Sequence, residues 1–186
     1  MWFLIQRIDM SKATVKKILM AMPKEEIIGM VLEMYDARKE AKEYLEFYAN
    51  PDEDGKLEEY KKIIIEEFYP AKSSREPKTR FSVCRKAISD YKKLKPSPEK
   101  LADLMLCYVE NACQFTYDYG DMWEQYYTYT SVENNFDKTT AFIAKNNLLE
   151  HFKPRLRQCV EWASPCGWGF ADSMEDIYYE HFSADD

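Results

Sequence analysis

Residues 97–112 read SPEKLADLMLCYVENA and carry the clearest helical signal in the chain. The opening Ser-Pro pair is typical of a helix start, because serine caps the first turn and proline suits the first helical position. Apolar side chains then recur every three or four residues, at Leu101, Leu104, Met105, Tyr108, Val109 and Ala112. This spacing places them on one helical face. We expect Cys107, Cys113 and Tyr117 to widen that face, which makes this the most buried helix.

The same spacing extends outward over most of the chain. It predicts further helices over residues 11–22, 24–35, 41–48, 57–68, 81–91, 121–143, 148–163 and 174–181. An interruption or a fresh start is expected near Pro154, because a proline inside a helix costs about 3 kcal/mol. Only five glycines occur in 186 residues, which is few for folds with many glycine turns. We therefore predict an all-α fold of about eight or nine helices, with antiparallel helical hairpins stacked into one compact domain.

Two segments fall outside the helical pattern. Residues 70–80 contain two prolines and no apolar period, so they are predicted to form one long loop. Residues 1–9 precede Ser11, which is placed to cap the first helix. We expect an extension or a short packed arm over residues 1–9 and a single helical domain over residues 10–186. The apolar start lacks the basic residue and the cleavage site of a signal peptide, and no apolar run is long enough to span a membrane.

Residues 16–35 and 85–108 have a similar sequence pattern. Each stretch contains a short basic helix, a turn with proline, and then a longer apolar helix that ends near a tyrosine. The offset between the two is not constant, so chance spacing is the alternative to a true repeat. A repeat favours stacked antiparallel helix pairs over a four-helix bundle.

Several stretches together resemble an uncharacterised bacterial family of small helical proteins. They are PKEEII at 23–28, KEYLEFY at 42–48, AISDYKKL at 87–94, GWGF at 167–170 and IYYE at 177–180. The similarity extends over residues 11–182, and the family is a domain of unknown function met in Bacteroides-type genomes. The resemblance implies one compact domain and an intracellular bacterial protein. It brings no known catalytic residue.

The sequence offers few reactive groups. Its five cysteines are an odd number without a CxxC pair, which predicts buried free thiols in a reducing cytoplasm rather than disulfides or zinc ligands. There are two histidines, His151 and His181, and no nucleophile, P-loop or dinucleotide motif. Acidic residues between 172 and 180 share a helical face near His181, but acids in a first helical turn ordinarily complement the helix dipole. We predict no catalytic residue, no cofactor and no metal site, and an enzyme with an unfamiliar site is a minor alternative.

The charge distribution is the strongest functional clue. The net charge is −7, yet residues 70–100 hold ten Lys or Arg against three acids, a local charge of +7 that leaves −14 elsewhere. Residues 101–137 contain seven acids and no base. One interpretation is that the basic helix folds against this acidic neighbour. The other is a basic face that binds a phosphate backbone or an acidic partner. Its candidate residues are Lys72, Arg75, Lys78, Arg80, Arg85, Lys86, Lys92 and Lys93.

The sequence alone does not define a molecular function. Tyrosines and acids crowd residues 117–129, where they either line a pocket or interface or simply border an amphipathic helix. The leading hypothesis is a non-catalytic cytoplasmic interaction module whose partner is another protein. The alternative is a binder of nucleic acid or of an acidic partner through residues 72–95. Nucleic-acid binding would be weak, because the charge on the rest of the chain repels the same ligand.

Overall fold

The computed structural model describes residues 10–72, 76–120 and 126–182, without the side chains of residues 126 and 127. Within these ranges nine α-helices and no strand occur, which confirms the all-α fold class. None of the described helices combines the length and the apolar content that a membrane span requires. The chain divides into two compact units, Met1–Pro51 and Asp52–Asp186. The single domain over residues 10–186 stays a prediction, and residues 1–9 lie outside the described part.

The first unit contains three helices, α1 (Lys12–Ala21), α2 (Lys24–Ala37) and α3 (Lys39–Ala49). Ser11 caps α1 as predicted, because its hydroxyl oxygen accepts a hydrogen bond from the Thr14 backbone N–H at 3.2 Å. α2 and α3 pack together at Tyr35, whose hydroxyl donates to Glu46 at 2.8 Å. Neither α1 nor α2 contains a buried residue, whereas α3 buries Phe47.

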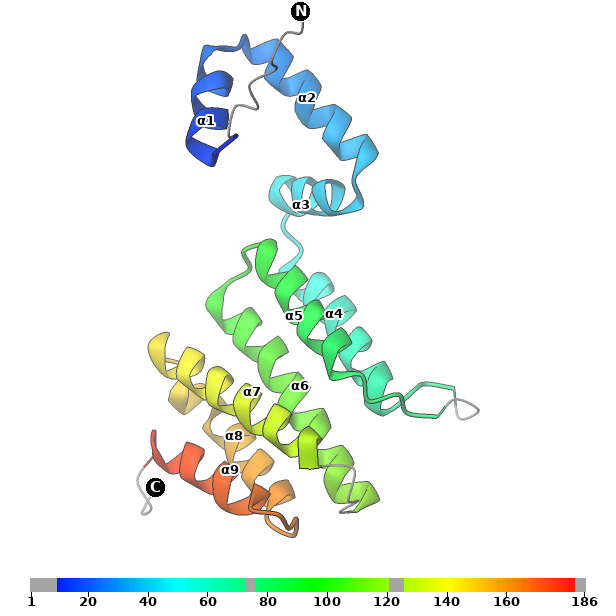
Figure 1. Cartoon of the computed structure of the whole chain (residues 1–186), viewed down its shortest axis with the longest axis vertical. Coiled ribbons are helices and arrows are strands. Elements are labelled where there is room, and N and C mark those ends of the chain that lie inside the picture. Colours follow the sequence, from blue (N-terminus) through cyan, green and yellow to red (C-terminus); the bar gives the residue numbers. More distant parts are fainter. Residues whose placement is uncertain (1–9, 73–75, 121–125, 183–186) are drawn as a thin grey trace, which may run out of the picture. The chain divides into compact units, whose positions relative to one another are not determined.

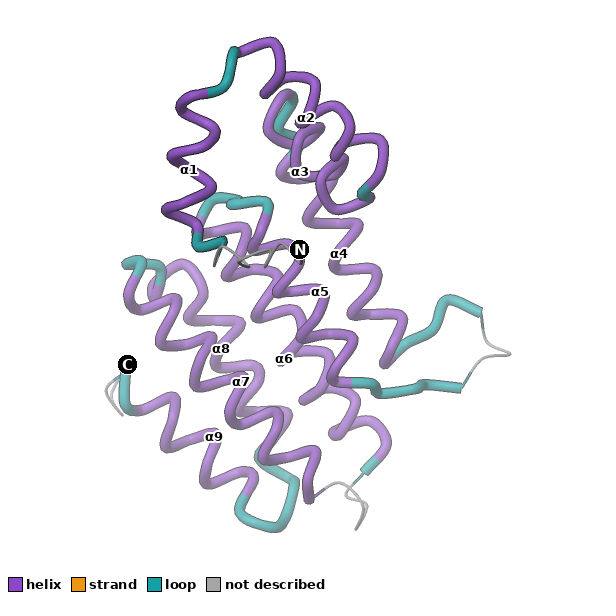
Figure 2. Tube along the Cα trace, turned by 45° about the horizontal axis from the view of Figure 1, so that its top comes forward, coloured by secondary structure: helices purple, strands orange, loops and turns teal. Residues whose placement is uncertain are grey.

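The second unit is built around one long helix, α6. Its helices are α4 (Glu53–Phe68), α5 (Phe81–Lys93), α6 (Pro98–Tyr119), α7 (Tyr126–Lys145), α8 (Leu149–Ala163) and α9 (Phe170–Tyr179). α6 contacts α4, α5, α7 and α8 (Figure 1). The consecutive pairs α4–α5, α6–α7 and α8–α9 also pack side by side, as the predicted hairpins require (Figure 2).

The apolar face of α6 forms the core of this unit. Leu104, Tyr108 and Val109 have no solvent-exposed surface, whereas Met105 is only half-buried. Cys107 and Cys113 widen the buried face as predicted. Tyr117 does not, because its side chain is 55% exposed. Residues 117–120 are all exposed, so the last turn of α6 extends beyond the cover that the other helices provide.

The predicted interruption at Pro154 is wrong. α8 is continuous through Pro154, which lies between the buried side chains of Phe152 and Leu156. A proline removes one backbone hydrogen bond from a helix. Packing of the buried α8 face on α6 offsets that loss.

The segment between α4 and α5 is held by Glu67, a buried residue near the end of α4. Its described residues, 70–72 and 76–80, are not helical, as predicted. The Glu67 carbonyl oxygen accepts hydrogen bonds from the backbone N–H groups of Lys78 and Thr79 at 3.0 and 2.9 Å.

Ser97 lies at the N-cap of α6 as predicted, but its hydroxyl donates to the Glu53 carboxylate at 2.7 Å instead of capping the helix. The first residues of the helix predicted over residues 121–143, 121–125, lie outside the described part.

Candidate interaction surface

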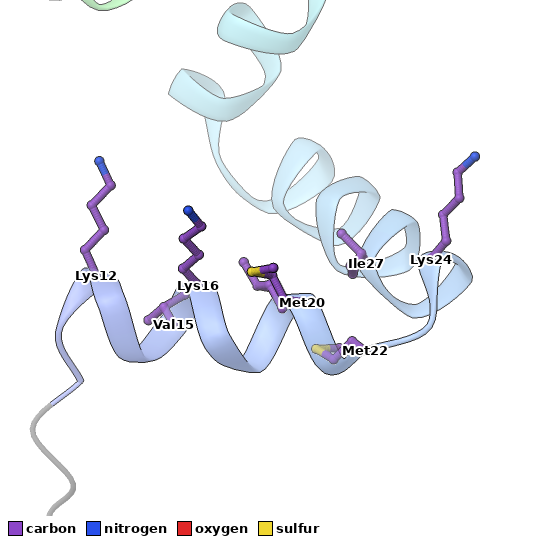
Figure 3. Close-up of a pocket in the computed structure, with 8 residues that line it drawn as sticks. Lys12, Val15, Lys16, Met20, Met22, Lys24 and Ile27 are labelled. Atoms are coloured by element: carbon purple, nitrogen blue, oxygen red, sulfur yellow. The ribbon is translucent and has the colours of Figure 1, made fainter.

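A groove between α1 and α2 is the candidate site in the first unit (Figure 3). Its volume is about 690 Å³, and it is lined by Lys12, Val15, Lys16, Leu19, Met20, Met22, Lys24 and Ile27. Met22 and Pro23 connect the two helices with extended backbone. A residue before proline is biased toward this conformation. Two extended residues turn the chain through an open corner, which leaves the inner sides of α1 and α2 accessible.

The helices around this groove expose many large apolar side chains. On α1 the exposed fractions reach 47% for Ile18 and 78% for Met20. On α2 the side chains of Ile28, Met30, Leu32 and Met34 are also exposed. Scattered single apolar residues are normal on protein surfaces, but a contiguous apolar patch marks an interaction site. Five of the nine methionines fall within residues 10–34, and methionine adapts its flexible side chain to varied partners.

Charge is segregated between the two helices. α1 carries three lysines and no acid, and Lys12 and Lys16 project from the same side of it (Figure 3). α2 carries one lysine and the four acids Glu25, Glu26, Glu33 and Asp36. The groove therefore has an apolar floor and a basic rim formed by Lys12, Lys16 and Lys24. Such a rim favours a ligand that carries carboxylates beside its apolar groups.

The sequence interpretation did not single out this surface. It predicted the helix over residues 11–22 and its apolar face, but a helical face of this kind ordinarily packs in a core. The available signal was the density of methionines together with lysines next to the apolar positions. Neither feature distinguishes a covered helix from an exposed one.

The basic segment of the second unit is partly paired with carboxylates of the same chain. Arg80 makes two hydrogen bonds to the Glu67 carboxylate, at 2.9 and 2.6 Å. Lys86 and Lys93 both bind Asp90, and the Lys93 Nζ lies 2.6 Å from its carboxylate. The hydrogen bonds from Arg80 lower the pKa of Glu67, and those from Lys86 and Lys93 lower the pKa of Asp90.

The remaining predicted residues differ in their surroundings. Arg85 donates to the Ser131 hydroxyl on α7 at 3.0 Å. Lys72, Lys78 and Lys92 are exposed, and no ion pair to them occurs among the described residues. Arg75 lies outside the described part of the chain. Four of the predicted cations, Lys72, Lys78, Arg85 and Lys92, thus have no carboxylate partner among the described residues.

Among the described residues, the acids of residues 101–137 form no ion pair with this segment. Asp103 instead binds Lys61 at 2.9 Å and Arg155 at 2.6 Å, and Asp118 accepts a hydrogen bond from the Tyr69 hydroxyl at 2.8 Å. Asp121 lies outside the described residues. Lys100, the last basic residue counted in residues 70–100, binds Asp54. Asp90 is already counted in the local charge of +7, so among the described residues that charge is reduced by Glu67, which binds Arg80, and by Asp54, which binds Lys100.

The aromatic residues 117–129 split into two environments. Tyr117 and Tyr119 are exposed at the end of α6. Tyr129 is buried and stacks on Phe170 of α9 with ring centroids 4.4 Å apart. The segment between them includes residues 121–125, which lie outside the described part, so its function as a pocket stays a prediction.

The reactive groups of the chain are poorly placed for chemistry. All five cysteines are free; Cys166 is half-buried and the other four are buried. Burial raises the pKa of both Cys84 and Cys107 to about 12, which keeps these thiols protonated and weakly nucleophilic. Among the described residues, no group of three His, Cys, Asp or Glu side chains is arranged to bind a metal ion.

A family model matches residues 10–183, which is most of the chain. The chain belongs to DUF6155. DUF6155 is a family of unknown function, which confirms the resemblance to an uncharacterised helical family, whereas the bacterial origin stays a prediction. Neither a curated protein nor a solved structure matches the DUF6155 chain.

Proposed function

We propose that this DUF6155 protein is a non-catalytic interaction module that binds another protein through the groove between α1 and α2. The observation that carries the proposal is that both helices present large apolar side chains and bury none of them. Burial of apolar surface contributes about 25 cal/mol per Å². An accessible apolar groove therefore gains free energy when a partner covers it.

A protein partner fits this surface better than a lipid membrane does. The first unit carries seven basic and seven acidic residues between positions 10 and 51, so its net charge is zero. Helices that bind membrane surfaces usually combine an apolar face with an excess of basic residues that attracts anionic lipids. The four acids of α2 oppose such binding.

The groove is suited to a helical segment of the partner. Helix-in-groove recognition uses apolar anchors at spacings of three and four residues. The groove supplies Val15, Leu19 and Ile27 for such anchors, and its lysines complement carboxylates on the same segment. We also propose a cytoplasmic location, which the five free thiols support because disulfides are rare in that compartment.

Affinity capture from the native cell tests the proposal. The tagged full chain is compared with Met20→Lys and Leu32→Lys, which place a charge on exposed apolar positions of α1 and α2. The matched control is Ile63→Lys, because Ile63 is a 44% exposed apolar residue of α4 in the other unit. We expect the first two variants to lose partners that the control retains. Capture of the same proteins by all three variants would refute the proposal.

The alternative, binding of nucleic acid or an acidic partner through residues 72–95, has less support. Arg80, Lys86 and Lys93 already bind carboxylates, and a polyanion would have to displace them. Within this segment, the exposed side chains of Lys72, Lys78 and Lys92 remain available to bind an anion. Three phosphate contacts support only weak, salt-sensitive association.

A further inference from the structure

We infer that a second copy of this chain occupies the groove, with an edge of α2 from each copy inserted between α1 and α2 of the other. The inference rests on the proposed function, because it assigns a first partner to the same surface. It follows from three features: the width of the apolar surface on α2, the charges along its edge, and the shortness of α1.

The apolar surface of α2 is wider than one neighbouring helix covers. At 100° per residue its apolar side chains spread over about 200° of the helix circumference, whereas a surface helix needs a stripe of about 100°. α3 packs on α2 at Tyr35, and Ile27 lines the groove. At the same 100° per residue, Ile28 and Leu32 lie about 100° and 140° around the helix from Ile27, on the side of Tyr35, and they are still 47% and 57% exposed.

The edge formed by Ile28 and Leu32 carries the charges that the groove requires. Glu25 precedes Ile28 by three residues, and Asp36 follows Leu32 by four, so both acids flank the apolar pair on the same side of α2. The groove offers apolar side chains between Lys12, Lys16 and Lys24. The edge of α2 is thus complementary to the groove in both polarity and charge.

A reciprocal arrangement satisfies both surfaces at once. In a twofold dimer each copy contributes one groove and one α2 edge, so the contact occurs twice. α1 has 10 residues, and isolated helices shorter than about 12–15 residues are only marginally stable in water. Contact with a second copy covers the apolar face of α1 and stabilises it.

The test is a charge exchange in the full chain, followed by sedimentation or light scattering over a concentration series. We expect the wild-type chain to dimerise. Lys12→Glu/Lys16→Glu makes the groove acidic against an acidic edge, and Glu25→Lys/Asp36→Lys makes the edge basic against a basic groove. Each double variant should weaken dimerisation at least tenfold at low salt. A mixture of the two should form a heterodimer, because both of its contacts are again complementary.

The control is Lys62→Glu/Lys138→Glu, which makes the same change of charge at two exposed lysines of the second unit. It should dimerise like the wild type. A monomeric wild type, or a mixture that does not restore the dimer, would overturn the inference. The proposed function would stand in that case if Met20→Lys still lost cellular partners. If no partner depends on Met20 or Leu32, the proposed function fails whether or not a dimer forms.

Discussion

α2 and α6 have nearly the same apolar content and opposite environments. Eight of the 14 residues of α2 are apolar, and so are 13 of the 22 residues of α6. Both follow a shorter helix that contains lysines, and a proline lies at the start of each. Yet α6 buries ten residues and α2 buries none.

The difference lies in what surrounds each helix. α6 contacts four other helices of its unit, whereas α2 packs extensively only on α3. An apolar stripe therefore indicates that one face of a helix is suited to burial, but the stripe does not show which part of the chain, or which partner, buries that face. In the second unit the chain itself supplies the cover. In the first unit the uncovered face of α2 is the basis of the proposed interaction.

The largest expected contrast is between two leucines. Leu104→Ala removes a fully buried side chain of α6 and should lower the free energy of unfolding by about 2–5 kcal/mol. Leu32→Ala alters a 57% exposed side chain of α2 and should change the free energy of unfolding by about 0.5 kcal/mol or less. Met105→Ala, at a half-buried position, should fall between them. Urea unfolding followed by circular dichroism measures all three, and equal midpoints for the two leucine variants would remove the contrast.

The next effect concerns ion pairs. Arg155 on α8 binds both oxygens of the Glu110 carboxylate at 2.7 Å and also Asp103, and these two acids are about 80% buried. Arg155→Met should therefore cost about 1–3 kcal/mol, less than the loss of a partner from a fully buried pair. Lys42→Met breaks the exposed pair of Lys42 with Glu46 on α3 and should cost about 0.5 kcal/mol or less. Similar thermal shifts for both variants would contradict this order.

A smaller, stabilising effect is expected in α2 itself. Gly29 lies inside the helix, and a Cβ atom built there meets no described atom within 4 Å. Gly29→Ala should stabilise the first unit by about 0.5–1 kcal/mol, because alanine loses less backbone entropy on helix formation. Increased helicity or delayed amide exchange in residues 24–37 would show this. Reduced helicity would mean that another group occupies the space beside Gly29.

Acid sensitivity is expected from the buried carboxylate of Glu67. Arg80 lowers the pKa of Glu67 from its usual value of 4.5, so the folded chain binds fewer protons there than the unfolded chain. This stabilisation is present above about pH 4.5 and is lost as the pH falls through the lowered pKa. The stability difference between wild type and Arg80→Met should shrink over that range. A stability difference that stays constant over this range would contradict the stabilisation of the Glu67 carboxylate by Arg80.

The smallest effect is expected from the basic segment. If Lys72, Lys78 and Lys92 contact phosphates, the logarithm of affinity for a short single-stranded oligonucleotide should fall with a slope of about 2 against the logarithm of salt. Affinity should be micromolar or weaker at physiological salt, since the chain is negatively charged overall. Lys92→Ala should reduce the slope, whereas Lys62→Ala on α4 should not. Fluorescence titration measures this, and the absence of binding at low salt would end the nucleic-acid alternative.

The sequence by itself determined the helices. The three-and-four spacing, Ser11 and Ser97 at helix starts and the prolines near helix ends act over a few residues, so they are readable without the rest of the chain. The core face of α6 was predictable for the same reason, because its apolar residues leave no other face to bury. Two predictions from local spacing were wrong. Tyr117 continues the apolar pattern of α6 but lies where no other described helix covers it, so its side chain is exposed. Pro154 does not interrupt α8, because the neighbouring side chains of Phe152 and Leu156 are buried in the core.

Only the tertiary structure decided which carboxylate meets which cation and which apolar face stays open. Glu67 reaches Arg80 across 13 residues, and Arg155 reaches Asp103 across 52. Such contacts depend on how helices that are distant in the sequence pack together, and the spacing of residues within one helix does not indicate that packing. For the same reason α1 and α2 read like core helices in the sequence, although the fold leaves their apolar side chains exposed. The spacing of apolar residues shows that a helix has an apolar face, and only the packing of the whole chain shows whether that face is buried.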